Sequence, residues 1–276
     1  MSMIEKIEAR LRELIPPRDE TIFEAARYAL LSPGKRLRPL LALTTAATLG
    51  ADPLLALDPA CAIEMIHAYS LIHDDLPCMD DDDMRRGKPS LHKVYGEAIA
   101  LLAGDYLLTF AFQVIADAKN LSPEQRLQMI KSISAHSSAP GMIGGQAIDI
   151  ESEGREIDED TLLQMHYGKT SSLFIAAVEC GRIAANVECP LLAPIGLELG
   201  LAYQFQDDLF DVPPVGKTLG SDAANRKATA LSVYGRTAAQ EKLHSLERTL
   251  FERLLHLPNQ GSALAALIHH ILKRKV

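Results

Sequence analysis

The sequence predicts an all-α protein that folds as a single helical domain. Apolar residues recur every three or four positions along most of the chain, proline or glycine marks the breaks, and no stretch alternates like a strand. Because the breaks are short and no internal repeat is present, we expect residues 1–276 to form one domain. The helices expected from this pattern cover residues 4–14, 21–31, 37–49, 62–72, 97–118, 123–138, 159–187, 190–210, 236–257 and 262–273.

The amino-acid composition and the net charge argue against several classes of protein. Apolar residues make up 47% of the chain and charged residues 23%, which is ordinary for a soluble globular protein. The 36 acidic residues exceed the 28 basic ones, and the net charge of −8 argues against nonspecific nucleic-acid binding. The N-terminus is charged where a signal peptide is apolar, and no uncharged apolar run approaches the ~18 residues of a membrane span. The four cysteines lack metal-binding spacing, so we expect a reduced, cytoplasmic protein.

The most acidic segment runs from Asp74 to Asp83 and is followed by Arg85 and Arg86. It contains six aspartates and follows the apolar helix expected at 62–72. Such a cluster needs a counter-charge, and oxygen ligands suit hard divalent cations such as Mg²⁺. The two arginines would supply contacts to phosphate oxygens beside the metal.

Pro77 predicts how this segment folds. On one continuous helix Asp74 and Asp80 would face away from each other, but proline disrupts a helix interior. We therefore expect the chain to turn at Pro77 and bring Asp80 back to a metal held by Asp74. The remaining aspartates could be further ligands or merely solvated charges: Asp81, Asp82 and Asp83.

A second acidic cluster ends another apolar helix. Asp207, Asp208 and Asp211 fall within an arc of about 100° on a helix, so their side chains can point the same way. Two such clusters predict a site in which metal ions are held between facing helices.

These segments resemble known motifs in a known order. DDLPCMDDDDMRRG (residues 74–87) and QDDLFD (206–211) resemble the two aspartate-rich motifs of the trans-isoprenyl diphosphate synthases, the polyprenyl synthetase family. The first has the bacterial form, with two extra residues between the aspartates. GKRLRP (34–39), GQAID (145–149) and GKT (168–170) resemble three further motifs of this family. The resemblance implies the isoprenoid synthase fold, a helical bundle around a central apolar cavity.

The resemblance also implies roles for individual residues. About three Mg²⁺ ions would bridge the two aspartate motifs and the allylic diphosphate, with ligands at Asp74, Asp75, Asp80, Asp207, Asp208 and Asp211. The diphosphate of isopentenyl diphosphate would meet Lys35, Arg38, His67 and Arg86. Arg85 and Lys169 would contact the allylic diphosphate, with Thr170 on the nearby backbone and Gln204 near the reacting carbons. Lys217 and Lys227 would close over the leaving diphosphate. The catalytic set would comprise Asp74, Asp80, Arg85, Lys169, Asp207 and Lys217.

Without the resemblance, several of these features have simpler interpretations. Lys35 to Arg38 would be a solvated helix start, His67 a core histidine, and Gln146 and Asp149 a buried polar pair. The chain also departs from the family pattern, because residues 212–217 form a short loop, Leu231 replaces a usual proline and Ser172 a common glycine.

The implied reaction joins isopentenyl diphosphate head-to-tail to dimethylallyl or geranyl diphosphate by ionisation, condensation and elimination. Tyr69 and Ser70, five and four residues before Asp74, would set the cavity depth and favour (2E,6E)-farnesyl diphosphate. Geranyl or geranylgeranyl diphosphate is the alternative main product, and Tyr69 could simply pack between helices. The resemblance also implies a homodimer.

Two other classes of protein share some of these features. A class I terpene cyclase also uses aspartates and Mg²⁺, but such enzymes tend to have aromatic walls, and this chain has no tryptophan and 5% aromatic residues. A helical binding protein or an inactive synthase subunit would be expected to lack one aspartate cluster, and this chain has both.

Overall fold

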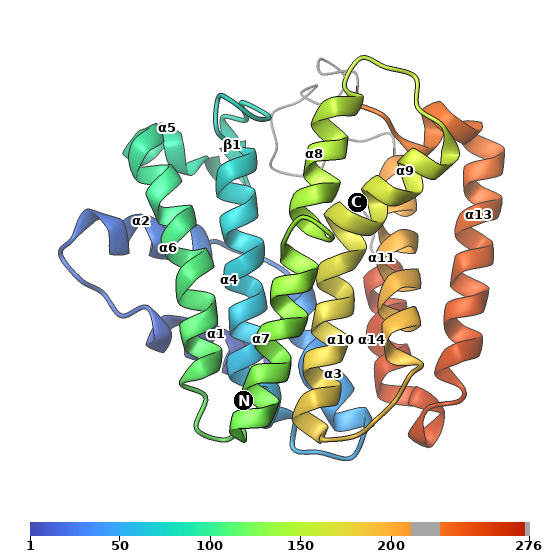
Figure 1. Ribbon diagram of the computed structural model, residues 1–276, viewed down its shortest axis with the longest axis horizontal. Coiled ribbons are helices and arrows are strands. Elements are labelled where there is room, and N and C mark those ends of the chain that lie inside the picture. Colours follow the sequence, from blue (N-terminus) through green and yellow to red (C-terminus); the bar gives the residue numbers. More distant parts are fainter. Residues whose placement is uncertain (211–226, 274–276) are drawn as a thin grey trace.

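The computed structural model describes residues 1–210 and 227–273. Two predicted site residues, Asp211 and Lys217, lie outside the described residues. The described chain is almost entirely helical, and its long helices run side by side along one axis (Figure 1). The all-α fold predicted from the sequence is confirmed.

The helices are α1 (Met3–Leu14), α2 (Thr21–Leu30), α3 (Leu37–Thr48), α4 (Leu57–Asp74), α5 (Leu91–Tyr95), α6 (Glu97–Ala116), α7 (Pro123–Ser137), α8 (Met142–Ser152), α9 (Glu159–His166), α10 (Ser172–Ala185), α11 (Leu192–Leu209), α13 (Ala230–Leu254) and α14 (Ser262–Leu272). Short turns of other helical types are η1 (Pro53–Ala56), η2 (Tyr167–Ser171) and η3 (Pro258–Gly261). Local sequence fixes several helix starts. Ser2 and Glu5 form a capping box at α1, and Ser122 and Gln125 form another at α7.

The core is built around α3, α4 and α10, whose surfaces are buried on nearly every side. α4 packs against α6 and α3, and α10 packs against α3 and α11 (Figure 1). Helices without a polar face are expected in the interior of a large helical domain. One connected set of buried apolar side chains extends from Ile7 in α1 to Leu272 in α14.

Local conformations interrupt the predicted pattern at two places. The helix expected over residues 159–187 is divided, because the π-turn η2 separates α9 from α10. The sequence also gave no sign of a hairpin formed by β1 (Met84–Arg85) and β2 (Lys88–Pro89). Arg86 and Gly87 between them have φ values of 54° and 75°. Positive φ at both positions is the geometry of a two-residue hairpin turn, which a strand-pattern search does not detect.

The arrangement of α4 and α11 positions the site. Both helices run toward the same end of the bundle, at the top of Figure 1, where β1 follows α4. The two acidic motifs therefore begin at one end of the molecule, although more than a hundred residues separate them in sequence.

Two helical segments are long and apolar enough to cross a membrane by length and composition. Residues 53–74 are 67% buried within the fold, and residues 97–116 are 39% buried. The first has the burial expected of a core helix.

Candidate active site

The first acidic motif folds back on the end of α4. The backbone N–H of Asp80 donates to the carbonyl of Asp74 at 2.8 Å, and the N–H of Asp82 donates to the carbonyl of Asp75 at 3.3 Å. The turn predicted at Pro77 is therefore present, and it places Asp80 beside the helix end that carries Asp74. The backbones of Asp74 and Asp80 are thus adjacent, and a metal ion shared by their side chains stays a prediction.

Asp75 and Arg85 form a partly buried ion pair in this motif. Arg85 Nε donates to Asp75 Oδ1 at 2.9 Å, and Asp75 is 2% exposed. Burial alone would lower the Arg85 pKa, but the hydrogen bond and charge of Asp75 outweigh it, so the pKa is raised. Asp75 thus has a counter-charge within the protein, and its role as a metal ligand stays a prediction.

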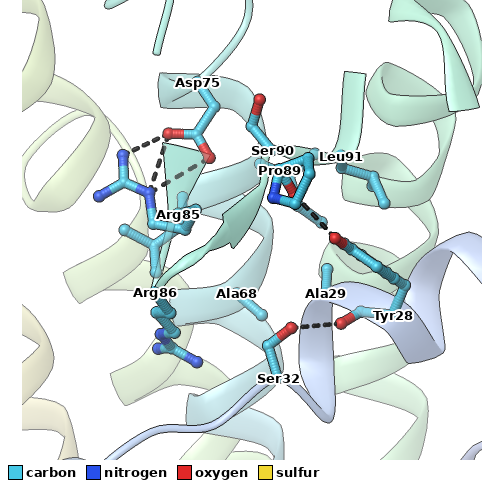
Figure 2. A pocket seen from close by; sticks show the side chains of 12 residues that line it. Tyr28, Ala29, Ser32, Ala68, Asp75, Arg85, Arg86, Pro89, Ser90 and Leu91 are labelled. Atoms are coloured by element: carbon cyan, nitrogen blue, oxygen red, sulfur yellow. Dashed lines mark hydrogen bonds and ion pairs between the residues drawn. The ribbon is translucent and has the colours of Figure 1, made fainter. Parts of the chain in front are cut away.

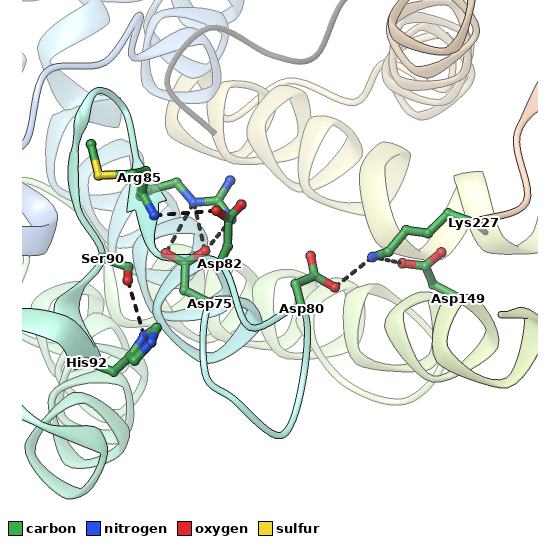
Figure 3. A network of polar contacts seen from close by, with 9 residues as sticks. Asp75, Asp80, Asp82, Arg85, Ser90, His92, Asp149 and Lys227 are labelled. Carbon is green, nitrogen blue, oxygen red and sulfur yellow. Dashed lines mark hydrogen bonds and ion pairs between the residues drawn. The ribbon is translucent and has the colours of Figure 1, made fainter. Parts of the chain in front are cut away.

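A lysine bridge joins the motif to α8 and to the π-turn. Lys227 Nζ lies 2.6 Å from Asp80 Oδ1 and 3.2 Å from Asp149 Oδ2 (Figure 3). Lys169 Nζ lies 2.5 Å from the same Asp149 oxygen. Burial raises the pKa of Asp149, but the charges of the two lysines lower it by more, so the net shift is downward. Burial lowers the pKa of Lys227, but the charges of Asp149 and Asp80 outweigh burial, so the net shift is upward.

The position of Lys169 depends on the close approach of two backbones. η2 packs so tightly on α8 that a Cβ at Gly168 would lie 2.7 Å from Gly145 Cα. A Cβ at Gly145 would lie 2.0 Å from the Lys169 nitrogen. Only glycine fits at both positions, which explains why the GQAID and GKT segments carry one glycine each at this contact.

The second acidic motif divides its aspartates between two environments. Asp207 is exposed at the end of α11, and Asp208 is partly buried beside it. Asp208 accepts hydrogen bonds from Gln204 Nε2 at 2.9 Å and from the Ala230 N–H at 2.7 Å. His166 Nε2 lies 3.4 Å from its second oxygen. Asp208 therefore fixes the start of α13, and its predicted role as a metal ligand remains untested.

Gln204 and Thr170 lie within hydrogen-bond distance of each other, and their roles in an allylic site stay predictions. Thr170 Oγ1 donates to Gln204 Oε1 at 2.8 Å, and Gln204 in turn donates to Asp208. This chain of hydrogen bonds connects η2 to α11 and orients the Gln204 amide.

A cluster of cations surrounds His67. The pKa of His67 is held well below its usual range by burial and by the positive charges of Arg38, Arg86, Arg85 and Arg36. Burial likewise lowers the pKa of Arg38, whose Nε has no hydrogen-bond partner among the described residues. His67 is therefore neutral at pH 7, and the cluster offers excess positive charge to an anion.

Arg36 differs from the other arginines of this cluster. It is 2% exposed and donates to Glu8 Oε1 and to Glu64 Oε1, both at 2.7 Å. Arg36 is thus neutralised by the protein and anchors the GKR loop, whereas the predicted ligand Lys35 is exposed. Arg86 lies against this loop, since a Cβ at Gly34 would lie 3.0 Å from its Nη1.

A small pocket lies on the side of α4 that faces α2 (Figure 2). Arg85 and Arg86 line it together with Asp75, Tyr28 and Pro89. Tyr28 Oη donates to the Pro89 carbonyl at 2.9 Å, so α2 anchors the hairpin that carries both arginines.

The two residues predicted to set product length lie on α4 near Asp74. Tyr69 is 5% exposed, its ring contacts His73 edge-on at 5.6 Å, and its hydroxyl has no hydrogen-bond partner among the described residues. Burial, with a contribution from the charge of Asp74, raises the pKa of Tyr69 to about 12. Ser70 Oγ donates to the His67 carbonyl at 2.9 Å. Tyr69 is thus a buried, bulky side chain close enough to Asp74 to sense its charge.

Sequence reasoning overlooked Glu64 and His166. Glu64 is 3% exposed and balances Arg36, and His166 is 3% exposed beside Asp208. Both stand among apolar residues in their helices, and an ionisable residue in such a position was the available signal.

Comparison with known proteins places this geometry in a family. The sequence model of the polyprenyl synthetases matches residues 19–257. The farnesyl diphosphate synthase of Geobacillus stearothermophilus is 42% identical over 260 residues, which cover 91% of this chain and 88% of the relative. The chloroplastic geranylgeranyl pyrophosphate synthase 12 of Arabidopsis thaliana is 38% identical over 284 residues, which cover 98% of this chain and 79% of the relative.

A solved structure shows the same architecture. The geranyltransferase of Helicobacter pylori, described as complexed with magnesium and isoprenyl diphosphate, superposes with a TM-score of 0.89 at 30% identity. The match covers 99% of this chain and 96% of that structure. Fold, motif order and sequence identity agree, and the chain belongs to the polyprenyl synthetase family.

Proposed function

We propose that this polyprenyl synthetase condenses isopentenyl diphosphate with dimethylallyl and geranyl diphosphate, and that its main product is (2E,6E)-farnesyl diphosphate. The observation that carries the proposal is the pairing of two charged regions. The acidic motif, tied through Lys227 and Asp149 to Lys169, lies next to the cation cluster of Arg38, His67 and Arg86. One region suits a metal-bound diphosphate and the other a second diphosphate.

The residues present fit Mg²⁺. Asp74 and Asp80 offer only oxygen donors, and the hydrogen bond between their backbones keeps them adjacent. Asp74, Asp80 and Asp207 would hold the ions, with Asp75, Asp208 and Asp211 as the other predicted ligands. When bound, Mg²⁺ neutralises charge that develops on the departing pyrophosphate.

The protein's own side chains supply the remaining steps. Lys169 and Lys227 would release Asp149 and Asp80 in part and hold the allylic diphosphate, with Arg85 and Lys217 as further predicted contacts. Arg38, Arg86 and Lys35 would hold the isopentenyl diphosphate, and His67 would donate to it as a neutral imidazole. The double bond of isopentenyl diphosphate attacks the allylic cation, and a pyrophosphate oxygen takes the proton that is lost. The surrounding apolar helices exclude the water that would quench the cation.

Tyr69 supports the C15 product. It is buried on α4 near Asp74, and its bulk would limit the length of a prenyl chain that starts at the aspartates. Geranylgeranyl diphosphate is the second candidate product, because a relative of similar identity carries that name.

The proposal extends to the domain organisation, the oligomeric state and the location of the protein. We propose that residues 1–276 form one polyprenyl synthase domain, since a continuous core joins α1 to α14. We propose a homodimer, and α6 offers an apolar surface for it at Leu101 and Leu102, which are 46% and 52% exposed. We propose a cytoplasmic location, because both substrates are charged and water-soluble.

The test is product analysis. The protein is incubated with Mg²⁺, isopentenyl diphosphate and dimethylallyl diphosphate, and the dephosphorylated products are separated by chromatography. Farnesol is expected, and no prenyl product would contradict the proposal. Farnesyl diphosphate alone is the matched control, because a terpene cyclase would convert it to a hydrocarbon and a synthase would not.

A further inference from the structure

Three side chains that the site described above does not use converge at the acidic loop. One ligand atom each from Asp81, Asp83 and His92 lies within 4.8 Å of the others. The two aspartates are exposed, and the histidine is buried in α5. The sequence left open whether these two aspartates are metal ligands or solvated charges.

The histidine provides an independent observation that points to a ligand. His92 is 7% exposed, and its Nε2 is buried without a hydrogen-bond partner among the described residues. Its other ring nitrogen, Nδ1, lies 3.2 Å from Ser90 Oγ (Figure 3). A buried polar atom without a partner destabilises the fold, so a ligand that supplies the partner is favoured. Metal-binding histidines commonly donate a hydrogen bond from the nitrogen that does not bind the metal, and the Ser90 contact suits that arrangement.

Lys93 now neutralises the two carboxylates. Its Nζ lies 2.7 Å from Asp83 Oδ1, and the charge of Asp81 adds to the attraction. The lysine side chain is 42% exposed, so it can turn into solvent without leaving a buried charge. A divalent cation would replace this ammonium. It would also give His92 Nε2 the partner that Lys93 does not provide.

We propose that Asp81, Asp83 and His92 bind a divalent transition-metal ion, Mn²⁺ or Zn²⁺, at a structural site distinct from the Mg²⁺ sites of catalysis. An imidazole with two carboxylates favours these ions, whereas Mg²⁺ prefers oxygen ligands alone. The bound ion joins the loop of the first motif to α5. Because Asp80 and Asp82 adjoin the two ligands in sequence, the ion restrains the loop that presents them.

The test uses nitrogen coupling to bound Mn²⁺. Pulsed electron paramagnetic resonance of the full chain, saturated with Mn²⁺, detects a directly bound imidazole nitrogen. The predicted catalytic ligands are all oxygen atoms, so only the proposed site gives this signal. We expect the coupling in the wild type, and its absence at saturation would overturn the proposal. Since the measurement needs no turnover, it is independent of whether the proposed reaction is observed.

Variants assign the signal to these residues. His92→Gln should abolish the nitrogen coupling, and Asp83→Asn should weaken the Mn²⁺ affinity of the same site about tenfold or more. Asp83 is exposed, so its variant tests the site even if His92→Gln fails to fold. Asp105→Asn is the matched control, because Asp105 is an exposed carboxylate 3.9 Å from His73, and it should leave the signal unchanged. Coupling that persists in Asp83→Asn at wild-type affinity, or in folded His92→Gln, would refute the assignment.

Removal of the Lys93 ammonium should change the Mn²⁺ affinity in the direction opposite to that of the ligand variants. Lys93→Ala should bind Mn²⁺ several-fold more tightly at this site, because the metal no longer displaces an ion-paired ammonium. Unchanged or weaker binding would contradict the proposed position of the metal.

Discussion

At the residue scale, Asp149 owes its charged state to two lysines. Their charges hold its pKa below the 3.8 typical of aspartate, so the ionised carboxylate stabilises the fold fully above about pH 4. This stabilisation is lost as the pH falls through the folded-state pKa. Asp149→Asn should therefore lower the free energy of unfolding by about 1.5–3 kcal/mol at pH 7 and by less below pH ~4. Urea unfolding of both proteins from pH 7 to 3 measures the difference.

The control for this prediction is Asp19→Asn, which changes an exposed carboxylate. It should leave stability within about 0.5 kcal/mol of the wild type at every pH. An Asp149→Asn deficit that stays constant on acidification would contradict the lysine pairing.

Tyr69 is the residue at which product length can be tested. Its ring is buried near Asp74, so Tyr69→Ala should deepen the cavity and shift the product from C15 to C20 or longer. Tyr69→Phe keeps the ring and removes a hydroxyl that has no partner among the described residues, so it should retain C15. Chromatography of the alcohols distinguishes the two. A C15 product from Tyr69→Ala would leave Tyr69 with a packing role alone.

At the element scale, the π-turn η2 holds Lys169 in place. Its contact with α8 has no room for a side chain at Gly168, where a Cβ would meet Gly145 Cα at 2.7 Å. Gly168→Ala should therefore cost about 1–3 kcal/mol of stability and reduce turnover, because Lys169 moves away from Asp149. Calorimetry and steady-state rates check both effects.

Gln164→Ala, at an exposed position of α9 just before the turn, is the matched control. It should be close to the wild type in melting temperature and rate. If Gly168→Ala behaved like this control, the close approach of η2 and α8 would not matter to the site.

Sequence periodicity located the long helices well but not the local interruptions. The burial of apolar faces determines where α3 or α11 runs, and that pattern is visible in the sequence. The π-turn depends on Gly145 lying opposite Gly168, a tertiary contact that no local pattern reveals. α5 and the hairpin β1–β2 are too short to show a period.

The candidate site, like the fold, could be predicted from the sequence only in part. Motif spacing located the aspartates, the turn at Pro77 and the arginines of the cation cluster. It did not reveal that Asp75 pairs with Arg85 or that Asp208 holds the start of α13. These partners come from elements distant in sequence or from a turn conformation, so only the folded chain brings them into view.

At the scale of the whole molecule, the fold brings the ends of α4 and α11 to one end of a helical bundle (Figure 1). We propose that Asp74 and Asp207, one from each helix, act on the same metal-bound diphosphate. Two residues that serve one group have non-additive effects on the rate.

The most direct measurement is kcat/KM for Asp74→Ala, Asp207→Ala and the double variant, with circular dichroism to show that each is folded. Each single variant should lose about 100-fold or more in kcat/KM, as expected when several kcal/mol of charge stabilisation are removed. The double variant should be little worse than either single one. A near-normal rate in either single variant, or losses that multiply in the double variant, would rule out a diphosphate site shared by Asp74 and Asp207.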